Sequence, residues 1–314
     1  MTRVAVVGAG VVGGATAWAL RERGADVTVY EQFEQVEHER GSSHGRTRIF
    51  RLAYPQEEWV RLAEEALAGW RELGGDVLAL HGLVELAPAR ELTSADALAR
   101  CGAEFSFDPP DERVRVPAGW TALWQPAAGV VHADRARRAL LDGVDVRTGV
   151  RVDEPAALDA DAVVLAVGAW IRRFAADVPV RVTRETVAYF RHDGPPLPSV
   201  VELNARRGHA MYALHDPMHG LKAGVHFGGA ESDPDETGEP EPALVERIAA
   251  WVAERFPAAE PEPAAAQACL YTSTADESFV LERRGRLVVG SACSGHGFKF
   301  APAVGRRLAD LALR

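Results

Sequence analysis

Apolar and polar residues follow two different periods along this chain. Short apolar runs at Arg3–Val7, Asp26–Tyr30 and residues 160–167 are typical of buried strands. Between the first two runs, residues 12–23 are rich in alanine and end at Gly24, a residue type favoured just after a helix. The order strand, helix, strand predicts the repeating unit of a parallel sheet.

The later part of the chain continues this mixture of periods. A helical period in residues 55–73 places six apolar side chains on one face and predicts a packed structural helix: Trp59, Leu62, Ala63, Ala66, Leu67 and Trp70. Strands are predicted as a pair in residues 144–152, and singly in residues 180–191, 211–214, 221–227 and 287–289. Helices are predicted for residues 243–255 and 298–313. Two proline-rich segments, residues 231–242 and 257–266, are predicted to be surface connections.

Composition narrows the class of protein without revealing its chemistry. At 314 residues the chain has room for two domains, and 47% hydrophobic with 25% charged residues is typical of a soluble globular protein. A formal net charge of −10 argues against nucleic-acid binding, which needs a basic surface. No apolar run approaches the ~20 residues that span a membrane, and no secretory segment is expected at the N-terminus. Three widely spaced cysteines do not form a disulfide framework, so a reducing cytoplasm is expected.

A glycine pattern follows the first predicted strand. It reads Gly8-x-Gly10-x-x-Gly13, and Glu31 closes the second strand. Gly8 permits a tight turn, Gly10 lets the backbone approach a pyrophosphate, and Gly13 lets the helix pack close to the strand. N–H groups at the helix start can receive phosphates, and Glu31 can accept hydrogen bonds from ribose hydroxyls. The pattern predicts a bound dinucleotide, either NAD or FAD, and the acid disfavours the 2′-phosphate of NADP.

Two further segments favour FAD over NAD. One is the small-residue loop Gly41-Ser42-Ser43-His44-Gly45-Arg46-Thr47-Arg48-Ile49-Phe50-Arg51, which is too polar for the wall of a nicotinamide pocket. The other joins Cys269-Leu270-Tyr271-Thr272 to Ser294-Gly295-His296-Gly297-Phe298-Lys299-Phe300, and it is neither a metal nor a disulfide pattern. Together with the N-terminal glycines, these segments predict a flavin held by both ends of the chain. The simpler alternatives are a solvated surface loop and a buried structural thiol.

On these residues the chain resembles the monomeric sarcosine oxidase and N-methyl amino acid oxidase family, within the D-amino acid oxidase-like FAD-dependent oxidoreductases. The resemblance lies in residues 7–14, 41–51, 166–170, 221–226 and 269–299. It implies a FAD site formed by Gly8, Gly10, Gly13, Glu31, Ser42, Ser43, Thr47, Arg48, Gly168, Cys269, Gly295, Gly297 and Lys299. It also implies that Cys269 bonds to FAD through its sulfur, which requires a thiolate as nucleophile.

The resemblance implies roles for the side chains around the flavin as well. Lys222 matches the family lysine that sits over the flavin and assists oxygen by stabilising developing negative charge. Arg51 and Lys299 match the pair that holds the substrate carboxylate. Four further residues complete the expected catalytic set: Arg48, Tyr212, His226 and Tyr271. No metal site is expected.

The sequence thus predicts an α/β protein with two discontinuous domains. A Rossmann-like FAD-binding domain is expected from residues 1–78, 127–178 and 267–314, and a mixed-sheet α+β substrate domain from residues 79–126 and 179–266. The resemblance implies a monomer that oxidises a secondary or N-methyl amino acid, with sarcosine the leading candidate, to an imine and then an aldehyde plus amine. Oxygen would be reduced to hydrogen peroxide. Four alternatives stay open: a flavin dehydrogenase, a biosynthetic tailoring oxidase with another acceptor, a non-catalytic flavin-binding protein, and an NAD-dependent dehydrogenase.

Overall fold

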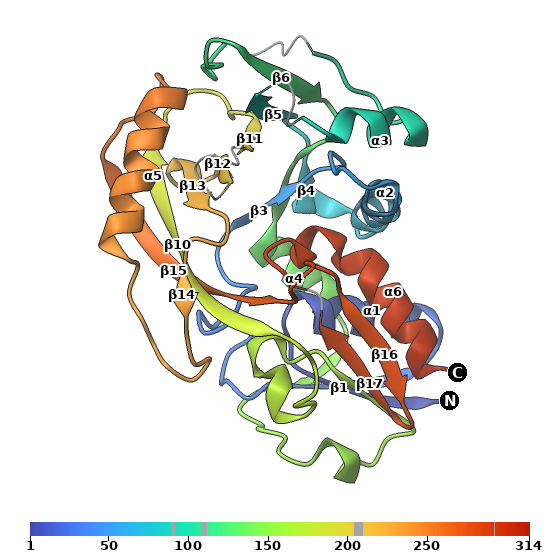
Figure 1. Ribbon diagram of the computed structural model, residues 1–314. Helices are drawn as coiled ribbons and strands as arrows, with labels where there is room; N and C mark the ends of the chain where they lie inside the picture. The colour runs from blue at the N-terminus through green and yellow to red at the C-terminus, as the bar shows by residue number, and fades with distance from the viewer. Residues whose placement is uncertain (89–91, 108–111, 204–209, 292) are drawn as a thin grey trace.

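The computed structural model describes residues 1–88, 92–107, 112–203, 210–291 and 293–314. Two large sheets dominate these residues, and helices pack against both of them (Figure 1). The two chain ends lie close together at the parallel sheet (Figure 1). This arrangement confirms the predicted α/β class, in which a dinucleotide-type parallel sheet stands beside a second, mixed sheet.

Among the described residues, six strands form the first sheet in the order β16-β17-β9-β1-β2-β8. They are β1 (Arg3–Val7), β2 (Asp26–Tyr30), β8 (Asp145–Arg147), β9 (Ala162–Leu165), β16 (Val280–Arg284) and β17 (Leu287–Ser291). Strand β1 pairs in parallel with β2 and β9, and β9 pairs in parallel with β17, whereas β16 is antiparallel to β17. The sheet therefore joins segments from the beginning, middle and end of the chain.

The second sheet is mostly antiparallel and has the order β14-β10-β13-β12-β11-β5-β6, with β15 paired to β10. Its strands are β5 (Leu83–Pro88), β6 (Trp120–Gln125), β10 (Arg181–Arg191), β11 (Ser199–Glu202), β12 (Met211–Asp216), β13 (Gly220–Val225), β14 (Ala230–Glu231) and β15 (Pro263–Ser273). Helix α5 (Pro242–Arg255) packs Ile248, Trp251 and Val252 onto one face of this sheet (Figure 1). Because side chains alternate along a strand, the opposite face is left for other residues.

A small sheet and several helices connect the two large sheets. The small sheet contains β3 (Thr47–Phe50), β7 (Gly129–His132) and β4 (Leu78–Ala79). The remaining helices are α1 (Val11–Glu22), α2 (Glu57–Glu72), α3 (Ser94–Cys101), α4 (Ala133–Leu141) and α6 (Ala301–Ala312), with 3-10 turns η1 (Gly75–Val77), η2 (Pro155–Ala157), η3 (Gly168–Arg173) and η5 (Gly297–Phe300). In the described part of the chain, no helix has both the length and the apolar character needed to cross a membrane.

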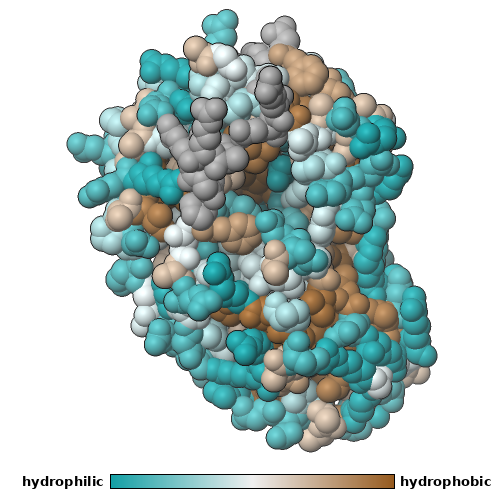
Figure 2. Space-filling view, in the orientation of Figure 1, coloured by the Kyte–Doolittle hydropathy of each residue, from teal (hydrophilic) through white to brown (hydrophobic). Residues whose placement is uncertain are grey.

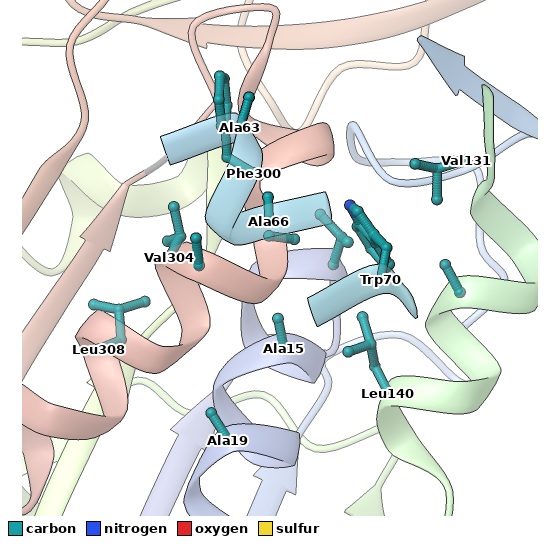
Figure 3. Close-up of a cluster of buried hydrophobic side chains, with 14 of the residues drawn as sticks. Ala15, Ala19, Ala63, Ala66, Trp70, Val131, Leu140, Phe300, Val304 and Leu308 are labelled. Carbon is teal, nitrogen blue, oxygen red and sulfur yellow. The ribbon is translucent and has the colours of Figure 1, made fainter. Parts of the chain in front are cut away.

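The largest hydrophobic core lies among α1, α2, α4 and α6 (Figure 3). Ala15 of α1, Trp70 of α2 and Val304 of α6 point into it and are fully buried. Helices α1 and α6 approach closely, because a Cβ atom on Gly305 would lie 2.4 Å from the backbone of Ala15. Polar side chains cover most of the molecular face shown in Figure 2, and apolar ones gather in its lower half.

Most predicted elements are confirmed, some of them with shifted ends. Strands Arg3–Val7 and Asp26–Tyr30 have the predicted bounds, and Gly24 adopts the left-handed φ of 75° expected after α1. The predicted C-terminal helix begins with the 3-10 turn η5 before it continues as α6.

Two of the predictions about secondary structure are wrong. Residues 144–152 form only the short strand β8, because Gly149 turns the chain at a φ of 67° and the Val150 N–H then donates to the Glu31 carbonyl. Residues 257–266 are not a plain surface connection, because β15 begins at Pro263 along the eleven-residue strand β10. Pairing with that long strand overrides the local turn signal of proline and alanine.

The predicted domain boundaries stay a prediction. Residues 267–273 lie in β15 and pair with β10 in the mixed sheet. A boundary that followed the sheets would therefore fall after Ser273 instead of before Gln267.

Candidate functional site

A cavity of about 950 Å³ lies between the parallel sheet and the free face of the mixed sheet. It is lined by every predicted site residue except Gly13: Gly8, Gly10, Glu31, Ser42, Ser43, Thr47, Arg48, Arg51, Gly168, Tyr212, Lys222, His226, Cys269, Tyr271, Gly295, Gly297 and Lys299. The fold thus brings residues from both ends of the chain to one space.

The glycine turn after β1 forms one wall of this cavity. Gly8 has a φ of 104°, and a Cβ atom on it would lie 2.5 Å from the carbonyl oxygen of Ala166. A Cβ atom on Gly13 would lie 1.8 Å from the Gly8 carbonyl oxygen, so Gly13 serves the contact between turn and helix without lining the cavity. Both positions require glycine for reasons of space.

Glu31 lies at the end of β2 with its carboxylate held by backbone N–H groups. Its Oε2 accepts from Ala9 N at 2.9 Å, and its Oε1 accepts from Phe33 N at 3.1 Å. Burial raises the pKa of Glu31, but hydrogen bonds from His38 and these two N–H groups outweigh it, so the net pKa is lowered. The side chain is therefore an ionised acceptor at neutral pH.

The loop of residues 41–51 is fastened to both neighbouring segments. Ser43 Oγ accepts from the Val11 N–H at 3.0 Å at the start of α1, and Ser42 Oγ donates to the Leu270 carbonyl on β15. The Arg48 guanidinium donates to the carbonyl oxygens of Ser42 at 2.7 Å and His44 at 2.6 Å. These contacts hold Arg48 as a fixed positive charge in the cavity wall.

His44 is a residue of this loop that the sequence did not single out. Its side chain is 3% exposed, and neither ring nitrogen has a hydrogen-bond partner among the described residues. Burial, assisted by the charges of Arg48 and Lys222, lowers the pKa of His44 to about 3. A neutral imidazole with two unused nitrogens at a cavity wall is suited to a polar ligand.

Strand register places the remaining predicted residues on the free face of the mixed sheet. Tyr212 on β12 pairs with Gly224 on β13, where a Cβ atom would lie 2.6 Å from the tyrosine hydroxyl oxygen. Lys222 and His226 lie two residues on either side of Gly224, so all of them share one face. Cys269 and Tyr271 on β15 line the same cavity.

The cations on this face are buried, and their protonation is shifted. Lys222 is 5% exposed, and burial together with the nearby charge of Arg48 lowers its pKa to about 7. Burial raises the pKa of the Cys269 thiol, while the charges of Arg48 and Lys222 partly oppose that effect. The sequence contains two lysines, Lys222 and Lys299, and both line the cavity.

The second lysine shares its surroundings with Arg51. Lys299 Nζ donates to the His296 carbonyl oxygen at 3.1 Å, and burial and the Arg51 charge lower its pKa well below the usual value. The Arg51 guanidinium lies 4.1 Å from the ring centroid of Tyr54, whose hydroxyl is 3.1 Å from His296 Nδ1. The structure thus brings the predicted carboxylate-binding pair to one part of the cavity.

Aromatic and acidic residues around this pair were missed by the sequence prediction. Tyr54, Trp59, His296, Glu85 and Glu277 all line the cavity. His296 lies inside the quoted C-terminal motif, and Tyr54 follows the basic loop closely, so their position was available as a signal. No sequence pattern pointed to Glu85, because its position at the cavity depends on which strands pair in the mixed sheet.

The wall residues suit a flavin dinucleotide. The Gly8 turn forms a cradle that a Cβ atom would fill, Glu31 presents an ionised acceptor, and His44 has two unsatisfied nitrogens. Arg48, Lys222 and Lys299 add positive charge, which an anionic pyrophosphate and an electron-rich ring favour.

Comparisons with known proteins agree with this geometry. The chain matches the family model described as FAD dependent oxidoreductase over residues 3–311, and it belongs to that family. Human peroxisomal sarcosine oxidase is 30% identical, over 98% of this chain and 91% of that protein. Monomeric sarcosine oxidase from Bacillus sp. (strain B-0618) is 27% identical, over 99% and 92%. The chain is accordingly an FAD-dependent oxidoreductase of the sarcosine oxidase type.

A solved structure supports the fold as well as the family. NikD, an unusual amino acid oxidase essential for nikkomycin biosynthesis, has a TM-score of 0.83 and 25% identity, covering 100% of this chain and 95% of that one.

His44 predicts how acid affects the flavin-free protein. Its folded pKa of about 3 lies below the unfolded value of about 6.5, so the unfolded state binds the extra proton between these pH values. The free energy of unfolding should therefore fall as pH drops below about 6.5, by up to about 1.4 kcal/mol per pH unit from this residue. His44→Leu should remove that share, which denaturant unfolding at pH 7 and pH 5 measures. Equal pH dependence in both proteins would contradict the assignment.

Proposed function

We propose that this protein oxidises a secondary or N-methyl amino acid, with FAD as cofactor and oxygen as electron acceptor. One observation carries the proposal: a single cavity contains the dinucleotide glycines Gly8 and Gly10 together with two cations suited to a carboxylate, Arg51 and Lys299. Relatives named sarcosine oxidase support the choice of substrate class. Cytoplasmic location and a monomeric state stay predictions.

The residues that would hold FAD come from both chain ends. Gly8, Gly10, Glu31 and the loop around Ser43 would take the dinucleotide, and Gly295 and Gly297 would approach it from the C-terminal side. When bound, FAD would supply the redox chemistry that carries two electrons from the CH–NH group of an amine to oxygen.

The substrate end of the cavity would orient the amino acid. The Arg51 fork gives bidentate contact to a carboxylate, and Lys299 adds a point charge beside it. Because these cations disfavour a third positive charge, the bound amine would release its proton and present a neutral lone pair. Tyr212, His226 and Tyr271 would form the wall on which the substrate rests.

Lys222 is assigned a role in the reaction of the reduced flavin with oxygen. Its side chain is buried on the same face as Tyr212, and a positive charge there stabilises negative charge that develops on oxygen without a proton transfer. Arg48, fixed by loop carbonyls, would add to this field.

The proposed function is tested by mixing the purified yellow protein with amines in the absence of air. Sarcosine, N-methyltryptophan, proline and pipecolate should include at least one compound that bleaches the flavin absorbance, and air should then restore the colour with release of hydrogen peroxide. Bleaching without peroxide would indicate a dehydrogenase. The absence of bleaching by every amine tried would favour a non-catalytic flavin-binding protein.

Covalent attachment at Cys269 gives a second prediction. The wild-type protein should retain its flavin in the pellet after acid precipitation, and Cys269→Ala should release it, because the sulfur that forms the bond is gone. Cys293→Ala is the matched control, since Cys293 lines the same cavity but lies on a different segment. A variant Cys269→Ala that keeps the yellow pellet would rule out this attachment point.

Lys222 gives a third prediction. Lys222→Met should slow reoxidation by oxygen by ~10²-fold, and slow reduction by the amine much less, because only the oxygen step develops the charge that the lysine stabilises. With a pKa of about 7, the wild-type reoxidation rate should also fall as pH rises through 7, and the variant should lose this dependence. Stopped-flow spectroscopy of each half-reaction measures both effects. Similar losses in the two half-reactions would remove the assigned role.

A further inference from the structure

A buried carboxylate lies beside the proposed carboxylate-binding pair and has no part in the reaction described above. Glu85 on β5 is 1% exposed, lines the cavity, and has its Oε2 atom 3.9 Å from Arg51 Nη1. The Ser94 hydroxyl donates to the same oxygen at 2.9 Å. A carboxylate is unfavourable to bury, so the presence of Glu85 next to Arg51 calls for an explanation.

Strand register shows that Glu85 faces the same space as the catalytic residues. Glu85 is aligned with Val201 on β11, and Val201 is aligned with Tyr212 on β12. Residues aligned across a sheet share a face, so Glu85 belongs to the row that contains Tyr212 and Gly224. Three strand spacings of ~4.8 Å separate β5 from β13, which places Glu85 roughly 14 Å across the sheet from Gly224, and Lys222 lies two residues further along β13.

Glu85 is nearer to Arg51 than to Lys222, because its Oε2 atom lies 3.9 Å from Arg51 Nη1. A substrate side chain that carries an ammonium and extends from a carboxylate held by Arg51 would therefore be able to meet Glu85. Arg51 is already partly neutralised by Glu85, so this end of the cavity attracts a lone anion less than two free cations would. Glu277 also lines the cavity near Arg51 and adds a second carboxyl group.

The aromatic residues nearby favour the same kind of ligand. Tyr54 already has Arg51 over its ring at 4.1 Å, and Trp59 lies beside Tyr54 with ring centroids 6.1 Å apart. Faces of such rings attract ammonium and guanidinium groups. Cation-attracting rings and a buried carboxylate thus lie at the same end of the cavity.

We infer that Glu85 is a specificity-determining residue that selects amino acids whose side chain carries a basic nitrogen. The inference rests on the proposed function, since it assumes that Arg51 and Lys299 hold the substrate carboxylate. In the complex, Glu85 accepts a hydrogen bond from the side-chain ammonium of the substrate, and Ser94 keeps the carboxylate oriented.

The test compares binding of matched carboxylates that cannot be oxidised at an α-amine. Isothermal titration of the holoenzyme with 4-aminobutanoate, 5-aminopentanoate and 6-aminohexanoate is set against butanoate, pentanoate and hexanoate. At least one amino compound should bind ~10-fold more tightly than its partner, as a charged hydrogen bond predicts. Glu85→Gln should reduce this ratio to about 2-fold or less, and Glu85→Asp should retain part of it.

Other outcomes separate the competing explanations. If Glu85 only positions Arg51, Glu85→Gln weakens both members of each pair equally, and the inference is wrong. A wild-type protein that binds each pair equally also overturns it, and this comparison needs no variant to fold. If none of the six carboxylates binds, the assigned carboxylate site fails as well. Bleaching of the flavin by simple amines then decides separately whether the proposed oxidase function survives.

Discussion

The site depends on direct contact between the first and last helices. Gly305 of α6 lies against the backbone of Ala15 on α1, and the strands that precede these helices join the same parallel sheet. The Gly8 turn leads directly into α1, and the Gly295–Gly297 segment leads into α6. The spacing of the two helices therefore sets the spacing of the two glycine turns. A larger side chain at Gly305 would move one wall of the cavity relative to the other.

The arrangement buries positively charged side chains, which is unfavourable. Lys222 and Lys299 are both nearly inaccessible to water, and their pKa values are lowered by burial. Backbone carbonyls compensate in part, because Lys299 donates to His296, and Arg48 donates to residues of its own loop. A carboxylate bound beside Lys299 would offset a further part of this cost and would thereby stabilise the folded protein.

The glycine turn could be predicted from a short stretch of sequence, but the register of the mixed sheet could not. The two strands of the βαβ unit were predicted with their exact bounds and its helix within one residue at each end, because Gly8, Gly13 and Glu31 obey rules of space and hydrogen bonding that hold within about thirty positions. Strand β15 was missed because its partner β10 lies some eighty positions away and decides its conformation. Glu85 and His44 were missed for the same kind of reason, because residues that surround each of them come from segments that are distant in the sequence and meet only in the folded chain. The family resemblance supplied most of the residues around the cavity, not their contacts.

The distribution of lysine and arginine separates two kinds of charge in this protein. Arginine provides the cations of the surface ion pairs, such as Arg23 with Asp310 and Arg307 with Glu65, and it stays protonated at any ordinary pH. Both lysines lie in the cavity, where desolvation moves a lysine pKa toward neutrality and leaves an arginine charged. Burial accordingly lowers the pKa of Lys222 to about 7 and that of Lys299 well below its usual value. Arginine at either position would keep its charge under the same desolvation.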